Sequence, residues 1–125
     1  MIEIKLPWPP TVLSPNSRAH WATVAKSKKR YRQACALYSI SQMRGSAPQP
    51  LPADGELALA LEFFPPSARK MDRDNLLARM KAGLDGVCDA LAIDDARFEP
   101  VTVSMKKPLR AGMVRVVISN EGASQ

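Results

Sequence analysis

Aspartate side chains gather in one short stretch of the chain. Six of the seven aspartates lie from position 72 to position 95, and four of them form two tight groups, Asp72 with Asp74 and Asp94 with Asp95. Carboxylate oxygens are hard ligands, and carboxylates that cluster without His or Cys suit Mg²⁺ or Mn²⁺ rather than zinc. This stretch therefore indicates a site for a divalent cation.

Ordinary structural roles also fit these aspartates. Asp74 is expected to cap the helix that follows it, where a negative charge is favourable. Asp94 and Asp95 suit a turn. A calcium loop of the EF-hand type is excluded, because that pattern would need an oxygen ligand at Leu76 and a glycine at Leu77.

A helix expected over residues 75–91 separates the two aspartate groups. If it were straight, its length would hold them roughly 25–30 Å apart. They can then meet across a dimer, or within one subunit if the helix ends early and the chain folds back. Lys81 lies about 20° from Asp74 around this helix. Its side chain either reaches a substrate phosphate or is an ordinary solvated helix lysine. Asp85 is farther away and is expected at the surface or at a subunit contact.

The remaining elements predict an α+β domain. Residues 56–64 alternate apolar and more polar side chains, which is typical of a half-buried strand. Further strands are expected at 3–6, 101–105 and 113–119, a continuous or broken helix at 18–43, and a loop at 45–55. The order β-α-β-α-β-β predicts a small mixed β-sheet packed with two main helices. Residues 1–120 form one domain in this prediction, and residues 121–125 form a flexible tail.

Charge divides the chain into a basic half and an acidic segment. The net charge is +6, and no Asp or Glu lies between Ile4 and Ala53. The first helix contains five neighbouring basic residues, Lys26, Lys28, Lys29, Arg30 and Arg32. Such a distribution favours a polyanion partner, with a merely solvated helix face as the alternative.

Length and composition set the class of protein. The 125 residues, with 46% hydrophobic and 24% charged content, fit one globular domain with its own core. No apolar run is long enough to span a membrane, and we expect a cytoplasmic protein. Cys35 and Cys88 form no ligand-like pair and are expected to be reduced thiols.

Three motifs together resemble the RusA family of Holliday-junction resolvases. They are the segment Leu-Pro-Trp-Pro-Pro at 6–10 with Ser-Pro-Asn at 14–16, then Asp-Arg-Asp-Asn-Leu at 72–76, then Asp-Asp at 94–95. The likeness in order and spacing covers most of the chain. The resemblance implies a RusA-like homodimer of small α+β subunits that binds four-way DNA junctions and cuts them with Mg²⁺, or with Mn²⁺ in its place.

The same resemblance assigns roles to single residues. Its metal ligands fall on Asp72, Asp74 and Asp95. The family commonly has a catalytic lysine four residues after the second aspartate, but that position here is Ala78. Lys81, one helical turn further on, is the expected substitute, and Arg79 is a weaker one.

The implied mechanism is metal-assisted hydrolysis of a phosphodiester in DNA recombination and repair. The metal would polarise the scissile phosphate and activate a water, and Lys81 would offset the charge that develops on the phosphate. Two symmetric nicks require two active sites related by a two-fold axis, which a homodimer provides.

Contacts to the DNA backbone are expected from two basic segments. One is the first helix, with the five basic residues named above, and the other is formed by Arg69, Lys70 and Arg73 beside the aspartates. Trp21 or Tyr31 could stack on an unpaired base, although a core or interface position is the more ordinary role. The alternatives to a resolvase are a non-catalytic nucleic-acid-binding protein and a metal nuclease that acts on other branched or single-stranded DNA.

Overall fold

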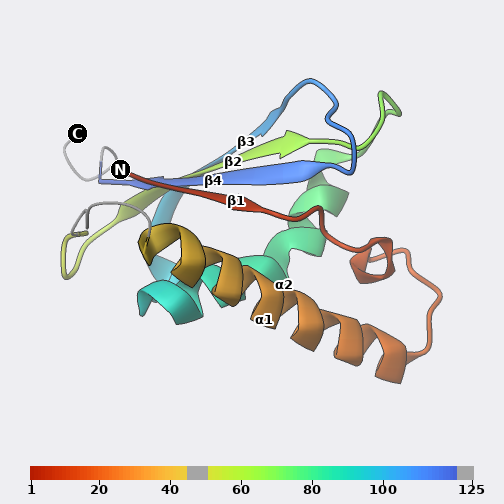
Figure 1. Ribbon diagram of the computed structural model, residues 1–125, viewed down its shortest axis with the longest axis horizontal. Helices are drawn as coiled ribbons and strands as arrows, with labels where there is room; N and C mark the ends of the chain where they lie inside the picture. The colour runs from red at the N-terminus through yellow and green to blue at the C-terminus, as the bar shows by residue number, and fades with distance from the viewer. Residues whose placement is uncertain (45–50, 121–125) are drawn as a thin grey trace.

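The protein is a four-stranded mixed sheet with two long helices on one face, in the parts of the chain that the computed structural model describes, residues 1–44 and 51–120 (Figure 1). In chain order the elements are β1 (Ile2–Leu6), the short 3-10 helix η1 (Thr11–Leu13), α1 (Trp21–Arg44), β2 (Leu57–Phe64), α2 (Arg73–Leu91), the 3-10 helix η2 (Asp95–Arg97), β3 (Phe98–Met105) and β4 (Met113–Ser119). This confirms the predicted α+β class and the β-α-β-α-β-β order. The predicted tail, 121–125, and the first part of the predicted loop, 45–50, lie outside the described residues.

Strand β2 lies inside the sheet, whose strand order is β1-β4-β2-β3. It pairs antiparallel with β4 and parallel with β3, so α2 is the crossover between two parallel strands. The side chains of β2 that face the helices are fully buried, as the alternation predicted: Leu57, Leu59, Leu61 and Phe63. Because β3 is an edge strand, its helix-side residue Val101 keeps 43% of its surface exposed.

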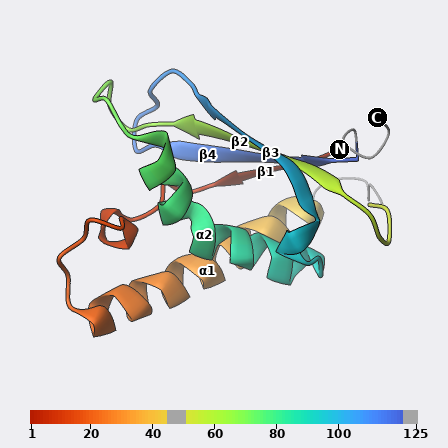
Figure 2. The same cartoon turned by 180° about the vertical axis from the view of Figure 1, so that it is seen from behind.

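Both helices cover the same face of the sheet and lie against each other (Figures 1 and 2). Two glycines of α2 allow this close approach. A Cβ at Gly86 would lie 2.2 Å from the carbonyl oxygen of Arg32, and a Cβ at Gly83 would lie 2.6 Å from Cε2 of Tyr31. The α1–α2 contact therefore depends on the missing side chains at these two positions.

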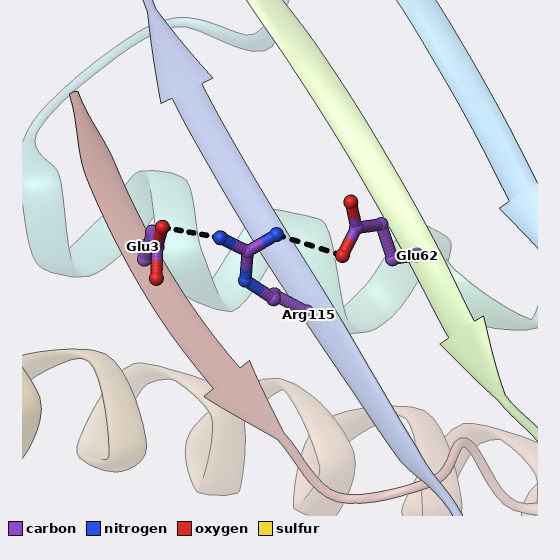
Figure 3. Close-up of polar contacts among 3 residues, drawn as sticks. All are labelled: Glu3, Glu62 and Arg115. Carbon is purple, nitrogen blue, oxygen red and sulfur yellow. Dashed lines mark hydrogen bonds and ion pairs between the residues drawn. The ribbon is translucent and has the colours of Figure 1, made fainter. Parts of the chain in front are cut away.

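The opposite face of the sheet carries a polar contact across three strands (Figure 3). The Arg115 guanidinium of β4 donates to Glu62 of β2 at 2.7 Å and to Glu3 of β1. These two carboxylates raise the pKa of Arg115, with Glu62 as the larger cause. Partly exposed ion pairs of this kind fix the strands to one another but contribute little stability.

Five of the six predicted elements start one to three residues away from the predicted position, and three of these starts have a local explanation. The cap of α2 is Asp72 rather than Asp74, because Asp72 has the extended backbone of a cap and its Oδ1 accepts from the N–H of Asp74 at 2.9 Å and of Asn75 at 3.4 Å. Strand β3 begins at Phe98, three residues early, since an edge strand tolerates Pro100. Helix α1 is continuous, and its first turn is capped by His20, whose Nδ1 accepts from the N–H of Ala22 at 3.2 Å.

Candidate functional site

A cleft between α2 and the start of β3 is lined by two of the three predicted metal ligands, Asp74 and Asp95. It has a volume of about 520 Å³, and its polar lining is Asp74, Lys81, Asp85 and Asp95. Its apolar lining comes from both elements and from the sheet: Leu59, Leu77, Ala78, Leu84, Phe98 and Val101. We call this hollow the acidic cleft. Its size is within the range of small-molecule sites.

The turn after α2 brings Asp95 back alongside the helix. Ala92 ends α2 in the left-handed conformation (φ 56°), and the Asp94 side chain then caps η2 by accepting from the N–H of Ala96 at 2.9 Å. Asp95 consequently lies with its Oδ2 at 4.0 Å from Nζ of Lys81. Asp74 and Asp95 therefore line one cleft within one subunit, although α2 runs to Leu91 and does not end early.

Asp72 is placed differently from the other two predicted ligands. It does not line the acidic cleft, and its Oδ1 accepts the two cap bonds of α2. In residues 1–44 and 51–120 there is no group of three or more His, Cys, Asp or Glu side chains positioned to hold a metal ion. Two of the three predicted ligands, Asp74 and Asp95, thus line the acidic cleft, and Asp72 lies outside its lining.

The acidic cleft has the oxygen donors that a divalent cation prefers. Its donors are carboxylate oxygens, which Mg²⁺ prefers, and Mg²⁺ is usually held by only one or two carboxylates together with waters and substrate phosphates. Asp74 and Asp95 both line the cleft and are exposed to solvent, so each is a candidate for such a ligand. The donor set therefore fits an open site that is completed by a substrate, and it does not fit an all-protein cage.

A second hollow adjoins the acidic cleft on the side of α1. It has a volume of about 510 Å³ and is lined by Leu13, Pro15, Lys28, Lys29, Arg32, Ala78, Arg79, Lys81, Ala82 and Asp85. We call it the basic pocket, since it has five cationic side chains and one carboxylate. It shares Ala78, Lys81 and Asp85 with the acidic cleft, so the two hollows meet over the middle of α2.

The predicted DNA-binding residues of α1 fall into two groups. Lys28, Lys29 and Arg32 line the basic pocket, whereas Lys26 and Arg30 are exposed and do not. Helix geometry explains the division, because Lys26 and Arg30 lie roughly 160° from Lys28 around the axis. The five positive charges thus spread over roughly half of the helix circumference, with Lys29 between the two groups, and do not form one narrow stripe.

Arg32 also has a structural partner. Its guanidinium donates two bonds to Asp89 of α2, at 2.7 and 2.9 Å. The hydrogen bond from Arg32 lowers the pKa of the Asp89 carboxyl, and the same bond raises the pKa of Arg32. Part of the charge of Arg32 is thereby used to join α1 to α2.

The second predicted basic segment surrounds the start of α2. Arg69 and Lys70 are exposed in the segment before α2, and Arg73 is the first residue of the helix. None of the three lines either hollow. They lie close in sequence to Asp72 and Asp74, as predicted, at the end of α2 away from Asp95.

Arg79 is the residue whose position the sequence did not reveal. It is only 9% exposed, and its Nη2 donates to the carbonyl oxygen of Pro9 at 2.6 Å. Its guanidinium carbon lies 5.9 Å from the centre of the Trp8 ring, and its buried Nε has no hydrogen-bond partner among the described residues. Loss of hydration on burial lowers its pKa.

The proline-rich segment after β1 holds the two helices. The Tyr31 hydroxyl of α1 donates to the carbonyl oxygen of Pro7 at 2.7 Å, and Pro9 receives the bond from Arg79 of α2. Farther along, the Ser14 hydroxyl donates to Oδ1 of Asn75 at 2.8 Å. The separate sequence motifs at 6–16 and 72–76 are therefore in direct contact.

Aromatic and thiol residues have mostly structural positions. Tyr31 is in the core, which is incompatible with base stacking, while Trp21 is 76% exposed and so is not a core residue. Cys35 and Cys88 are buried free thiols, as expected, and burial raises the pKa of each to about 11. For Cys88 the negative charge of Asp95 contributes as a second cause.

Fold and site together define a small α+β protein in which an acidic cleft and a basic pocket share one helix. No family model matches the chain. Over 119 residues it is 38% identical to an uncharacterized protein of Xylella fastidiosa (strain Temecula1 / ATCC 700964), and this match covers 95% of the chain and 76% of the relative. The chain belongs to the same family as that protein. The resemblance to RusA resolvases stays a prediction.

None of the helices in the described part of the chain is both long and apolar enough to cross a membrane.

Proposed function

We propose that this protein is a Mg²⁺-dependent endonuclease that cuts branched DNA, with four-way junctions as the substrate. One observation carries the proposal. Asp74, at the start of α2, and Asp95, after the end of that helix, line one cleft together with Lys81. An open pair of carboxylates next to cationic side chains is the arrangement that phosphodiester hydrolysis needs.

Asp74 and Asp95 are the proposed ligands of the cation. Asp72 lies outside the cleft lining and is proposed as a third ligand through Oδ2, because both of its cap bonds use Oδ1. A divalent ion held by these residues would supply Lewis-acid chemistry for phosphodiester hydrolysis by water. The protein's own contribution is to hold the carboxylates open to solvent and to an incoming phosphate.

Lys81 is proposed to bind the substrate phosphate in the transition state. Its side chain is 74% exposed and lines both hollows, so it stands at the boundary between the metal site and the cationic surface. At 4.0 Å from Asp95, its ammonium partly neutralises that carboxylate until a cation and a phosphate enter. This position supports Lys81 as the substitute for a lysine at Ala78.

The DNA backbone is proposed to lie over the basic pocket and the exposed basic residues that surround it. The excess of positive charge on α1 supports this, because no Asp or Glu lies in the whole of that helix. Two such subunits, related by a two-fold axis, would place one cutting site on each of two opposed strands.

The test is to incubate the purified protein with a synthetic four-way junction, with and without Mg²⁺, beside a linear duplex of the same sequence. Paired symmetric nicks in the junction are expected only with Mg²⁺. Asp72→Asn, Asp74→Asn and Asp95→Asn should each remove them. Asp54→Asn is the matched control, because Asp54 is an exposed carboxylate that lines neither hollow and should leave cutting intact.

A non-catalytic nucleic-acid-binding protein is the second candidate, and one set of contacts favours it. Asp72 and Asp94 act as caps, Asp89 pairs with Arg32, and Asp95 lies next to Lys81. This candidate predicts tight junction binding that persists in EDTA and yields no nicks at any Mg²⁺ concentration. The same incubation therefore separates the two functions.

A further inference from the structure

The basic pocket has features of a binding site in its own right. It is concave, and its cationic residues come from two helices: Lys28, Lys29 and Arg32 from α1, and Arg79 and Lys81 from α2. Its single carboxylate is Asp85. Like charges so close together repel one another unless an anion compensates them.

The buried arginine strengthens this reading. Burying a charged group is expensive unless it is paired, and in residues 1–44 and 51–120 no carboxylate forms an ion pair with Arg79. Its Nη2 donates to the carbonyl oxygen of Pro9, and its guanidinium lies over the Trp8 ring. Its Nε has no hydrogen-bond partner among the described residues. Both contacts hold the guanidinium in a fixed orientation at the wall of the pocket.

Partners are also missing for two further cations. Lys28 and Lys29 form no ion pair within the described residues, whereas Arg32 is paired with Asp89 and Lys81 lies near Asp95. The pocket thus contains three unpaired cations, one of them fixed and buried. A guanidinium with two flexible ammonium groups is a combination that recognises phosphate oxygens.

We propose that the basic pocket binds one non-scissile phosphate of the DNA strand whose neighbouring phosphate enters the acidic cleft. This rests on the proposed function for the identity of the strand. Because the two hollows share Ala78, Lys81 and Asp85, a phosphate held in the pocket fixes the position of the strand relative to Asp74 and Asp95. Arg79 is the fixed contact, and Lys28 and Lys29 close over the phosphate from α1.

The first experiment titrates inorganic phosphate into the metal-free protein by calorimetry at constant ionic strength. The pocket variant is Lys28→Gln with Lys29→Gln, and the control is Lys106→Gln with Lys107→Gln, which removes the same charge from exposed residues of the β3–β4 connection outside both hollows. Phosphate binding should weaken about tenfold or more in the pocket variant and about twofold or less in the control. Equal weakening in both would overturn the proposal, because it would reflect net charge alone.

Trp8 provides an independent readout beside Arg79. In a Trp21→Phe background, Trp8 is the single tryptophan, and its fluorescence should change as phosphate binds. Arg79→Lys keeps the charge but loses the planar fork, and it should weaken phosphate binding without unfolding the protein. If phosphate does not change the Trp8 fluorescence of the protein with intact Arg79, Arg79 is not a contact of the bound phosphate.

A second titration distinguishes a free phosphate ion from a phosphate of a strand. A single-stranded thymidine oligonucleotide, again without metal, should bind less tightly to the pocket variant than to the control. Loss of phosphate binding with unchanged oligonucleotide binding would overturn the assignment to a DNA strand. Neither titration uses cleavage, so a failed nuclease assay and a failed phosphate site are separate results.

Discussion

Nζ of Lys81, in the middle of α2, lies 4.0 Å from Oδ2 of Asp95, which follows that helix. The contact shows that the chain after α2 returns along the helix and does not continue away from it. Since both groups are more than half exposed, the contact itself contributes little to stability. Its importance is that it places a cation and a carboxylate at the same entrance.

Replacement of Lys81 tests its catalytic role. Lys81→Met should lower the rate of junction cleavage by about 100-fold, because the charge that develops on the phosphate loses a compensating cation. Binding of the divalent ion should persist, since Asp95 is retained and loses a competing positive neighbour. Full cleavage by Lys81→Met, with Lys106→Met as a control in the β3–β4 connection, would show that Lys81 is only a solvated lysine.

The glycines between the helices give a stability prediction. Gly86→Ala should lower the free energy of unfolding by about 2 kcal/mol or more, because its Cβ would meet a backbone oxygen that cannot move independently. Gly83→Ala should cost less, since the atoms nearest to its Cβ belong to the side chains of Tyr31 and Cys35. Chemical denaturation measures both. Helix propensity alone predicts a gain for each variant, so an increase in stability for Gly86→Ala would refute the close contact.

The turn that returns Asp95 can be strengthened. Ala92 has a positive φ of 56° at the end of α2, and glycine adopts this conformation without strain. Ala92→Gly should raise the free energy of unfolding by about 0.5–1 kcal/mol. Ala90→Gly, within the same helix, is the control and should lower it by a similar amount. Equal destabilisation by both would mean that the turn is not as described.

Stability should fall in alkaline solution. The pKa values of Cys35 and Cys88 are raised to about 11 by burial, so the unfolded chain releases these protons at lower pH than the folded protein does. The stabilisation is therefore complete below about pH 8.5, the usual pKa of a thiol, and is lost as the pH rises. Each thiol should account for on the order of 2 kcal/mol.

Denaturation midpoints from pH 8 to pH 10.5 measure this effect. The double variant Cys35→Ala with Cys88→Ala starts from a lower stability because of the lost packing, but it should decline less steeply with pH. An identical slope in both proteins would assign the alkaline loss to other groups, such as Tyr31, whose pKa burial also raises.

The sheet and helices followed from local patterns in the sequence. The alternation of β2 was clear because its four inward side chains all lie in the core. The face of α2 was less clear, because this helix packs against both α1 and the sheet. Leu77 and Leu84 are half-buried and line the acidic cleft, while Leu76 is fully buried.

The site was predictable in composition and not in geometry. The spacing of the aspartates indicated carboxylate chemistry, but the return of Asp95 depends on a left-handed alanine at position 92, a conformation that alanine rarely adopts. The burial of Arg79 depends on a contact with Pro9, 70 positions away along the chain. No local pattern contains such long-range contacts.

Binding of Mn²⁺ to the metal-free protein, followed by electron paramagnetic resonance without DNA, tests directly whether the acidic cleft is a metal site. Saturable Mn²⁺ binding is expected for the wild-type protein and for Asp89→Asn. Mn²⁺ binding weaker by about tenfold or more is expected for Asp74→Asn and for Asp95→Asn. Equal Mn²⁺ binding by all four proteins, or none by the wild type at millimolar concentration, would contradict a metal site in the acidic cleft.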